Sequence, residues 1–179
     1  AMQVAFKLGV KYREGFMKNR YIGRTFIMPG QRTRKRSVKQ KLNPIEIEFR
    51  DKRVLLVDDS IVRGHTSKNI VKMVRDCGAS KVFLASASPP IRHQNVYGID
   101  MPATKELIGH NRSVERIKKY IKADELIYQD LEDLTRSASI GNPKIKEFED
   151  SVFTGKYRVG NITEEFLKNL EQTRSSLPK

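Results

Sequence analysis

The chain has 179 residues, of which 38% are hydrophobic and 31% are charged. This balance is typical of a soluble globular protein and excludes an intrinsically disordered one. No apolar run approaches the roughly 18 residues of a membrane span, and no signal peptide is recognisable, so we expect no membrane partner and a cytoplasmic location. The single cysteine, Cys77, excludes an internal disulfide and a multi-cysteine metal site.

The net charge of +14 is concentrated in the N-terminal third of the chain. Residues 1–53 contain 15 of the 35 Lys and Arg but only 4 of the 21 Asp and Glu. The positive charge is densest in residues 32–41. This pattern predicts an anionic partner, such as nucleic acid or a polyphosphate, and the alternative is a solvated basic surface.

The first 50 residues predict one helix and several extended segments. Residues 3–17 place Val4, Leu8, Tyr12 and Phe16 on one stripe, which favours an amphipathic helix. Residues 21–28 favour a strand or an extended segment. Residues 31–41 follow a Pro-Gly break, and we interpret them as a mobile basic loop that closes over an anion. The alternation in residues 45–49 predicts an edge strand or an extended lead-in.

The middle of the chain predicts a βαβ unit. Residues 53–57 form a short apolar strand, and residues 81–87 form the next one. Between them, Thr66 or Ser67 can cap a helix that runs to about Asp76 and stops at Gly78. A strand, a crossover helix and a second strand predict a parallel sheet.

The rest of the chain predicts helices, one further strand and a C-terminal extension. Residues 97–102 are rich in turn formers, residues 113–123 and 130–137 favour helices, and residues 125–129 favour a strand. Thr163 is expected to cap a last helix that reaches about Thr173. The fold class is therefore α/β, with a parallel sheet flanked by helices in residues 1–140 and a helical extension in residues 141–179.

The most informative segment is VLLVDDSIVRGHTS, residues 54–67. Two adjacent carboxylates, Asp58 and Asp59, follow an apolar strand, where they repel each other and gain nothing from burial. The small residues Gly64, Thr66 and Ser67 then lead into a helix, whose first N–H groups can bind a phosphate. This order predicts a sugar-phosphate site, and the alternative is that one carboxylate only caps the turn.

The other reactive residue types give weaker signals. His65, His93 and His110 lie on different segments without metal-ligand spacing, so we expect satisfied or exposed histidines. Cys77 is expected to pack in the core and not to act as a nucleophile.

Residues 54–67 resemble the phosphoribosylpyrophosphate (PRPP) signature of the type I phosphoribosyltransferases. Four further segments are similar to the glutamine PRPP amidotransferase family: NRYIGRTFIMPGQ, KLNP, VYGIDMP and SVFTGKY. The resemblance covers nearly the whole chain and implies a type I phosphoribosyltransferase-like fold that is incomplete at its N-terminus. It also implies a glycosyltransferase that forms 5-phosphoribosylamine from PRPP and glutamine-derived ammonia, at the start of de novo purine synthesis.

The same resemblance implies roles for individual residues. Asp58 and Asp59 are expected to contact the ribose hydroxyls of PRPP and to bind Mg²⁺. Lys41 would reach the pyrophosphate when the loop of residues 31–41 closes, and Gln31 would contact substrate. The remaining substrate-binding residues would line the 5′-phosphate: Arg63, Gly64, His65, Thr66 and Ser67. Purine nucleotides as inhibitors and a homo-oligomer in the full-length protein are implied as well.

The chain departs from that family at its N-terminus. The family's glutaminase domain begins with a cysteine that hydrolyses glutamine, whereas residue 1 here is Ala1. We therefore expect a C-terminal part that is inactive with glutamine by itself.

Two other hypotheses stay open. The first is a non-catalytic PRPP-sensing or nucleic-acid-binding regulator on the same fold, which the basic N-terminal third favours. Against nucleic acid, the basic segment lacks interleaved aromatic residues for base stacking. The second is a phosphoribosyltransferase that uses a nucleobase acceptor.

Overall fold

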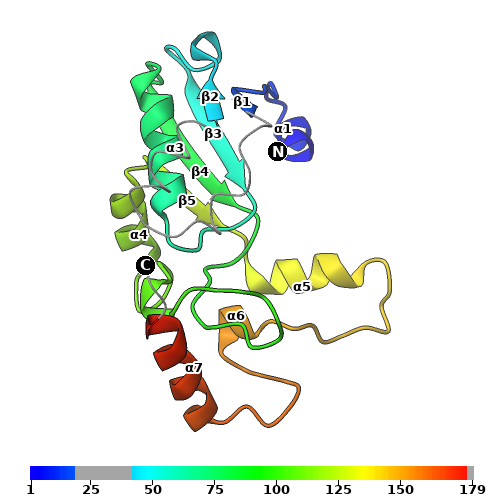
Figure 1. The fold of residues 1–179 in the computed structure, drawn as a ribbon. Helices are drawn as coiled ribbons and strands as arrows, with labels where there is room; N and C mark the ends of the chain where they lie inside the picture. Colours follow the sequence, from blue (N-terminus) through cyan, green and yellow to red (C-terminus); the bar gives the residue numbers. More distant parts are fainter. Residues whose placement is uncertain (19–41, 177–179) are drawn as a thin grey trace.

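The computed structural model describes residues 1–18 and 42–176 (Figure 1). Its centre is a three-stranded sheet of order β3-β4-β5, and a separate two-stranded sheet pairs β1 with β2. The central elements are β3 (Arg53–Asp58), α3 (His65–Asp76), β4 (Lys81–Ser86), α4 (Val114–Ile121) and β5 (Glu125–Tyr128). The others are α1 (Met2–Lys7), β1 (Phe16–Lys18), β2 (Leu42–Pro44), η2 (Glu46–Glu48), η3 (Thr104–Glu106), α5 (Leu131–Ser139), α6 (Ser151–Thr154) and α7 (Glu164–Ser176).

The central sheet is parallel, which confirms the predicted βαβ unit. Asp58 of β3 pairs in register with Ser86 of β4, and Ser86 pairs with Tyr128 of β5. The crossover helix α3 ends at Asp76, and Gly78 follows with a φ of +85°, a conformation that favours glycine. Consequently, the carboxyl ends of all three strands meet at one edge of the sheet.

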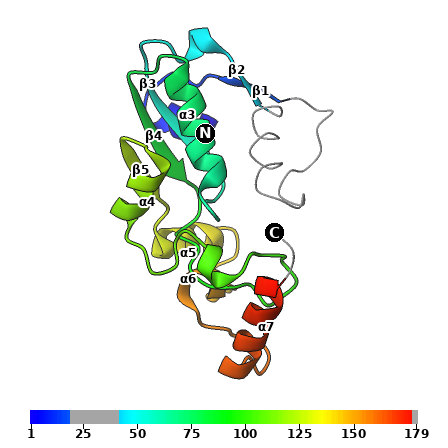
Figure 2. The same cartoon turned by 60° about the vertical axis from the view of Figure 1, so that its left-hand side comes forward.

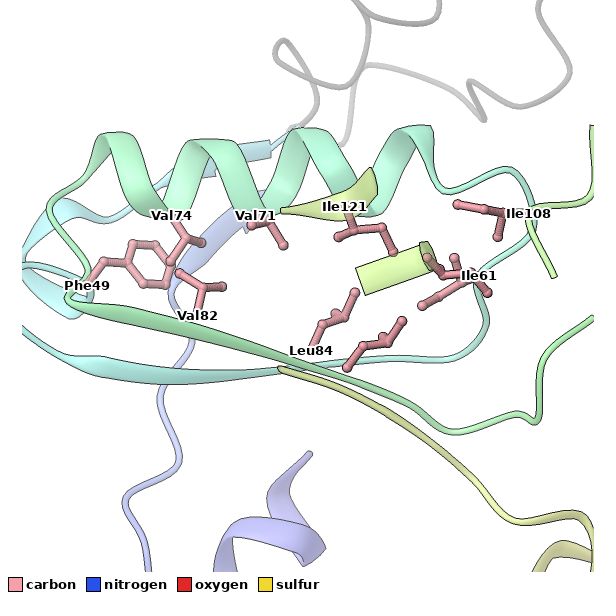
Figure 3. Packing of buried hydrophobic residues seen from close by; sticks show 10 residues of the cluster. Phe49, Ile61, Val71, Val74, Val82, Leu84, Ile108 and Ile121 are labelled. Atoms are coloured by element: carbon pink, nitrogen blue, oxygen red, sulfur yellow. The ribbon is translucent and has the colours of Figure 1, made fainter. Parts of the chain in front are cut away.

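The core lies between this sheet and the helices α3 and α4 (Figure 3). Val71 and Val74 of α3 and Ile117 and Ile121 of α4 are completely buried. Val82 of β4 faces them from the sheet, and the rest of the cluster consists of Phe49, Ile61, Leu84, Ile108 and Leu126. Because burial of apolar area is the main stabilising term in folding, this layer holds the sheet edge in place.

Three predicted helix starts are confirmed by their caps. The Ser113 hydroxyl accepts a hydrogen bond from the Arg116 N–H at 3.4 Å, at the start of α4. The Asp130 carboxylate accepts bonds from two N–H groups of α5, at 2.9 and 3.1 Å. The Thr163 hydroxyl accepts one from the Phe166 N–H at 3.1 Å, at the start of α7. A side-chain acceptor satisfies N–H groups that lack partners within the helix, so these residues determine where each helix begins.

The helix predicted for residues 3–17 is wrong in its extent. α1 ends at Lys7, and Gly9 follows with a φ of +63°. Val4 and Leu8 stay exposed, whereas Phe16 lies in β1 and packs against Phe49 with ring centroids 5.1 Å apart. An amphipathic helix depends on packing of its apolar stripe, and within the described residues Val4, Leu8 and Tyr12 of this stripe are not covered.

The edge strand predicted for residues 45–49 is also wrong, because this segment contains the 3₁₀ helix η2. The Phe49 N–H bonds the Glu46 carbonyl at 2.9 Å, and the Glu48 N–H bonds that of Ile45 at 2.9 Å. These local bonds turn the chain so that Phe49 enters the core. The predictions for residues 21–28 and 31–41 lie outside the described residues.

The C-terminal extension packs on the chain between β4 and α4. The N–H groups of Arg92 and His93 donate to the Val152 carbonyl, at 2.8 and 3.0 Å. The Glu171 carboxylate accepts from the Thr104 N–H at 2.7 Å, which joins α7 to η3. Figures 1 and 2 show α6 and α7 at the end of the molecule away from β1 and β2.

The division into domains at residue 140 stays a prediction. Among the described residues, no helix has the length and apolar character to cross a membrane.

We expect truncation of Ile121 to destabilise the protein. This side chain is 0% exposed, so Ile121→Ala leaves a cavity and should lower the free energy of unfolding by about 2–5 kcal/mol. Urea denaturation measures the change. The matched control is Ile140→Ala, at a position that is 81% exposed. Its free energy of unfolding should stay close to that of the parent protein. Equal losses in both variants would contradict the assigned core.

Candidate functional site

The two predicted carboxylates lie at the carboxyl edge of the sheet. Asp58 is the last residue of β3 and is half-buried, whereas Asp59 follows it and is exposed. The Asp58 Oδ1 accepts a hydrogen bond from the Asp59 N–H at 3.0 Å, and the Asp59 Oδ1 accepts one from the Ser60 hydroxyl at 2.7 Å. Neither carboxylate forms an ion pair within the part of the chain that the structure describes. The pair therefore places two carboxylates at the strand end without a neutralising cation from that part.

Burial raises the pKa of Asp58 above its ordinary value. The hydrogen bond from the Asp59 N–H opposes this shift, and the negative charge of Asp59 adds to it. A bound cation or a ligand hydroxyl would offset both effects, because either would stabilise the charged form. The site thus favours a cationic or hydrogen-bond-donating ligand.

The loop of residues 59–64 is attached both to the core and to residues 106–108. The Ile61 side chain is 1% exposed and belongs to the core. The Val62 carbonyl accepts from the Ile108 N–H at 2.8 Å, and the Arg63 Nε lies 2.9 Å from the Glu106 carboxylate. The loop is therefore attached to residues 106–108, a segment that the linear motif does not contain. Arg63, a predicted phosphate contact, is already paired with Glu106.

The helix after this loop begins earlier than predicted. Gly64 is the N-cap, with a φ of +73°, and α3 starts at His65. Thr66 and Ser67 therefore lie in the first turn and do not cap it. The first hydrogen bond of the helix joins the Lys68 N–H to the Gly64 carbonyl at 2.9 Å, so the N–H groups of the first turn have no acceptor within the helix. This turn can bind an anion, as the sequence predicts. We call residues 63–67 the cradle.

Gly64 is required at its position for two reasons. Its φ is in the left-handed region, and a Cβ built there would lie 2.3 Å from the Cδ1 of Ile108 and 3.3 Å from the Cε1 of Tyr120. The cradle is therefore packed directly against Ile108 and against the ring of Tyr120.

Tyr120 and Lys68 are site residues that sequence reasoning missed. The Tyr120 hydroxyl lies 2.7 Å from the Nδ1 of His65, and the Lys68 ammonium lies 4.4 Å from the centre of the Tyr120 ring. Tyr120 comes 55 residues after His65, on α4, and no local pattern marks it. The structure thus extends the cradle to a second helix.

The remaining predicted residues fall into two groups. Gln31 and Lys41 lie outside the described residues, so their roles stay predictions. Cys77 packs against the core, as predicted, and burial raises the pKa of its thiol.

Within residues 1–18 and 42–176, no cluster of three or more His, Cys, Asp or Glu residues could bind a metal by itself. A metal at Asp58 and Asp59 would need further ligands, such as water or substrate.

Tyr128 is the last residue of β5 and lies at the same edge of the sheet as Asp58. Its hydroxyl is buried and has no hydrogen-bond partner among the described residues, and burial raises its pKa to about 12. Tyr128 therefore stays neutral at physiological pH.

We expect Gly64→Ala to destabilise the protein more than the same change at Gly9. Both glycines have a left-handed φ, +73° and +63°, but a Cβ at Gly9 would meet nothing within 4 Å. The shared backbone strain should lower the free energy of unfolding by about 1 kcal/mol at each position, and overpacking against Ile108 should add about 1–3 kcal/mol at Gly64. Chemical denaturation measures both variants. Equal losses would contradict the close packing of the cradle.

We expect Asp58→Asn to stabilise the folded chain at neutral pH. The raised pKa means that the folded state favours the protonated carboxyl, so the stability that this group contributes is complete below its unfolded pKa and is lost as pH rises through the folded pKa. The advantage of the Asp58→Asn variant over the parent protein should therefore shrink as the pH falls. The measurement is the free energy of unfolding of both proteins across the acidic and neutral pH range.

Asp124 provides a control of opposite sign. A hydrogen bond from the Val82 N–H lowers its pKa, the Arg75 ion pair acts in the same direction, and burial opposes them. Asp124 contributes stability above its unfolded pKa that is lost as pH falls, so Asp124→Asn should destabilise the protein at neutral pH. A loss of stability in both variants at neutral pH would contradict the assignment for Asp58.

Comparison with known proteins finds close relatives of this chain. No family model matches it. The amidophosphoribosyltransferase of Pseudomonas aeruginosa is 57% identical over 179 residues, which are 100% of this chain and 36% of that protein. The Pasteurella multocida amidophosphoribosyltransferase is 56% identical, with the same two coverages of 100% and 36%. This chain spans about a third of the length of these relatives.

A solved structure agrees with the fold. Glutamine PRPP amidotransferase from B. subtilis, complexed with ADP and GMP, is 41% identical and superposes with a TM-score of 0.71, over 88% of this chain and 35% of that one. The predicted α/β fold class is confirmed. The 179 residues therefore belong to the amidophosphoribosyltransferase family, of whose members they represent a part.

Proposed function

We propose that this chain is the PRPP-binding, transferase part of an amidophosphoribosyltransferase. In the reaction, the bond between C1 of the ribose and pyrophosphate breaks, ammonia forms a new bond to C1, and the products are 5-phosphoribosylamine and pyrophosphate. The observation that carries the proposal is the carboxylate pair at the end of β3, directly before a helix that begins at a left-handed glycine. Its support is the family membership of the chain.

Asp58 and Asp59 would hold the ribose of PRPP. Carboxylate oxygens accept hydrogen bonds from sugar hydroxyls, and these contacts would keep C1 in a constant position relative to the attacking ammonia. The cradle would bind the 5′-phosphate with the N–H groups of its first turn, together with the hydroxyls of Thr66 and Ser67. The ribose and the 5′-phosphate of the substrate would therefore be held by adjacent parts of one loop.

The donor set of the carboxylate pair fits Mg²⁺. Magnesium prefers oxygen ligands, keeps several waters, and is commonly held by one or two carboxylates together with substrate phosphates. The raised pKa of Asp58 fits as well, since a cation would offset the repulsion between the two carboxylates. When bound, the metal would neutralise negative charge that develops on the departing pyrophosphate.

The protein's own residues would do the rest by positioning and by charge. The carboxylates of Asp58 and Asp59 would stabilise positive charge that builds on the sugar as the bond to C1 breaks. Lys41 would contact the pyrophosphate, and closure of residues 31–41 with Gln31 over the substrate would exclude water that otherwise hydrolyses PRPP. Ammonia would come from the glutaminase part of the full-length protein.

Purine nucleotides would inhibit by binding at the same cradle. The B. subtilis protein was solved with ADP and GMP. A nucleoside monophosphate shares the 5′-phosphate and ribose of PRPP, so the groups that hold one can hold the other. We propose in addition a homo-oligomeric full-length protein and a cytoplasmic location, in keeping with the purine pathway.

We expect Asp58→Asn together with Asp59→Asn to abolish PRPP binding. Isothermal titration of the chain with PRPP and Mg²⁺ should give weak binding for the parent protein and none for the double variant, since the ligands of both the ribose and the metal are removed. The matched control is Glu132→Gln with Asp133→Asn, an adjacent acidic pair on α5 with the same change in charge. It should bind as the parent does.

Unchanged PRPP binding by the Asp58→Asn, Asp59→Asn variant would overturn the proposal. The same titrations with RNA at several salt concentrations test the regulator hypothesis. Tight, salt-dependent RNA binding that PRPP does not displace would favour a nucleic-acid-binding protein.

A further inference from the structure

Tyr120 contacts the cradle and the adjacent Lys68 from a different helix. Its hydroxyl lies 2.7 Å from the Nδ1 of His65. Its ring lies under the Lys68 ammonium, 4.4 Å from the ring centre, and its Cε1 lies 3.3 Å from where a Cβ of Gly64 would be. A single side chain of α4 therefore meets residues 64, 65 and 68, which surround the first turn of α3.

The geometry of these contacts favours one protonation pattern of His65. A phenol hydroxyl can donate or accept a hydrogen bond. A cation over the ring withdraws electron density from it, which makes the hydroxyl a better donor. If the hydroxyl donates, the Nδ1 of His65 is the acceptor, and the neutral imidazole then carries its proton on Nε2.

We propose that Tyr120 is a positioning residue that acts through His65, holding its ring in the tautomer whose Nε2–H is a hydrogen-bond donor to the 5′-phosphate. The inference rests on the proposed function, because it assigns the phosphate of PRPP as the ligand of the cradle. Lys68 strengthens the arrangement by polarising the tyrosine ring. The cradle would thus gain an oriented donor from a side chain, in addition to its backbone N–H groups.

The hydroxyl of Tyr120 is not needed to fill the core. The residue is 36% exposed and lies outside the buried cluster. Phenylalanine would keep the ring against Gly64 and under Lys68, and would remove only the contact to His65. Tyr120→Phe is therefore a specific test of the proposal.

We expect Tyr120→Phe to weaken PRPP binding about fivefold in the presence of Mg²⁺, because loss of one oriented hydrogen bond has about this effect. His65→Ala should weaken binding at least as much, whereas His65→Gln should keep most of the affinity, since its amide N–H replaces the Nε2 donor. The control is Tyr97→Phe, which removes a hydroxyl that donates to the Val159 carbonyl at 2.9 Å on the C-terminal extension. It should bind as the parent does.

The double variant separates positioning from a general effect on structure. If Tyr120 acts through His65, then Tyr120→Phe should have no further effect in the His65→Ala or His65→Gln protein. The same fivefold loss in those backgrounds would overturn the proposal.

The ring nitrogens of His65 provide a direct readout that needs no ligand. The ¹⁵N chemical shifts of the labelled chain, assigned with the His65→Gln variant, should show a proton on Nε2 and none on Nδ1. Tyr120→Phe should convert this pattern to a mixture of tautomers. A proton on Nδ1 in the parent protein, or no change in the variant, would overturn the proposal.

The outcomes distinguish this inference from the proposed function. If the Asp58→Asn, Asp59→Asn variant loses PRPP binding while Tyr120→Phe binds normally, only the role of Tyr120 fails. If the aspartate variant binds normally, the proposed function itself fails, whatever the ¹⁵N shifts show.

Discussion

Attachment of the loop of residues 59–64 to the chain before α4 is the interaction on which the site depends. Ile61 enters the core, and the Val62 carbonyl accepts a hydrogen bond from the Ile108 N–H. The ion pair of Arg63 with Glu106 holds the end of the loop at 2.9 Å. A binding site needs rigid support, and here a buried side chain, a backbone bond and an ion pair provide it together. α7 reaches the same segment through Glu171, so the C-terminal extension supports the site indirectly.

The site contains local strain that the rest of the fold offsets. Asp58 is half-buried beside a second carboxylate, and the buried Tyr128 hydroxyl has no partner among the described residues. Each feature lowers stability in the absence of a ligand. The apolar layer between the sheet and α3 and α4 compensates for them. Binding groups concentrated at a strand end, with a stable core beneath them, are what a site for a charged sugar phosphate requires.

Local patterns predicted the parts of the fold that depend on neighbouring residues. The caps Ser113, Asp130 and Thr163 and the stop at Gly78 act within one helical turn, so sequence locates these boundaries well. One local prediction was wrong, because Gly64 and not Thr66 or Ser67 is the N-cap of α3. The other errors occurred where a pattern needs a distant partner. The apolar stripe of residues 3–17 does not form a long helix in the described structure, and the alternation of residues 45–49 gives a 3₁₀ turn that brings Phe49 into the core.

The sequence by itself determined the order of chemical groups at the site, from the carboxylates of Asp58 and Asp59 to the small residues of the cradle, because all of them lie in one continuous segment. Only the tertiary structure decided what surrounds them. Glu106 follows Arg63 by 43 residues and Tyr120 follows His65 by 55. Parallel strands need long crossover connections, so the groups that meet at their carboxyl ends are distant in the chain, and no local periodicity can identify them.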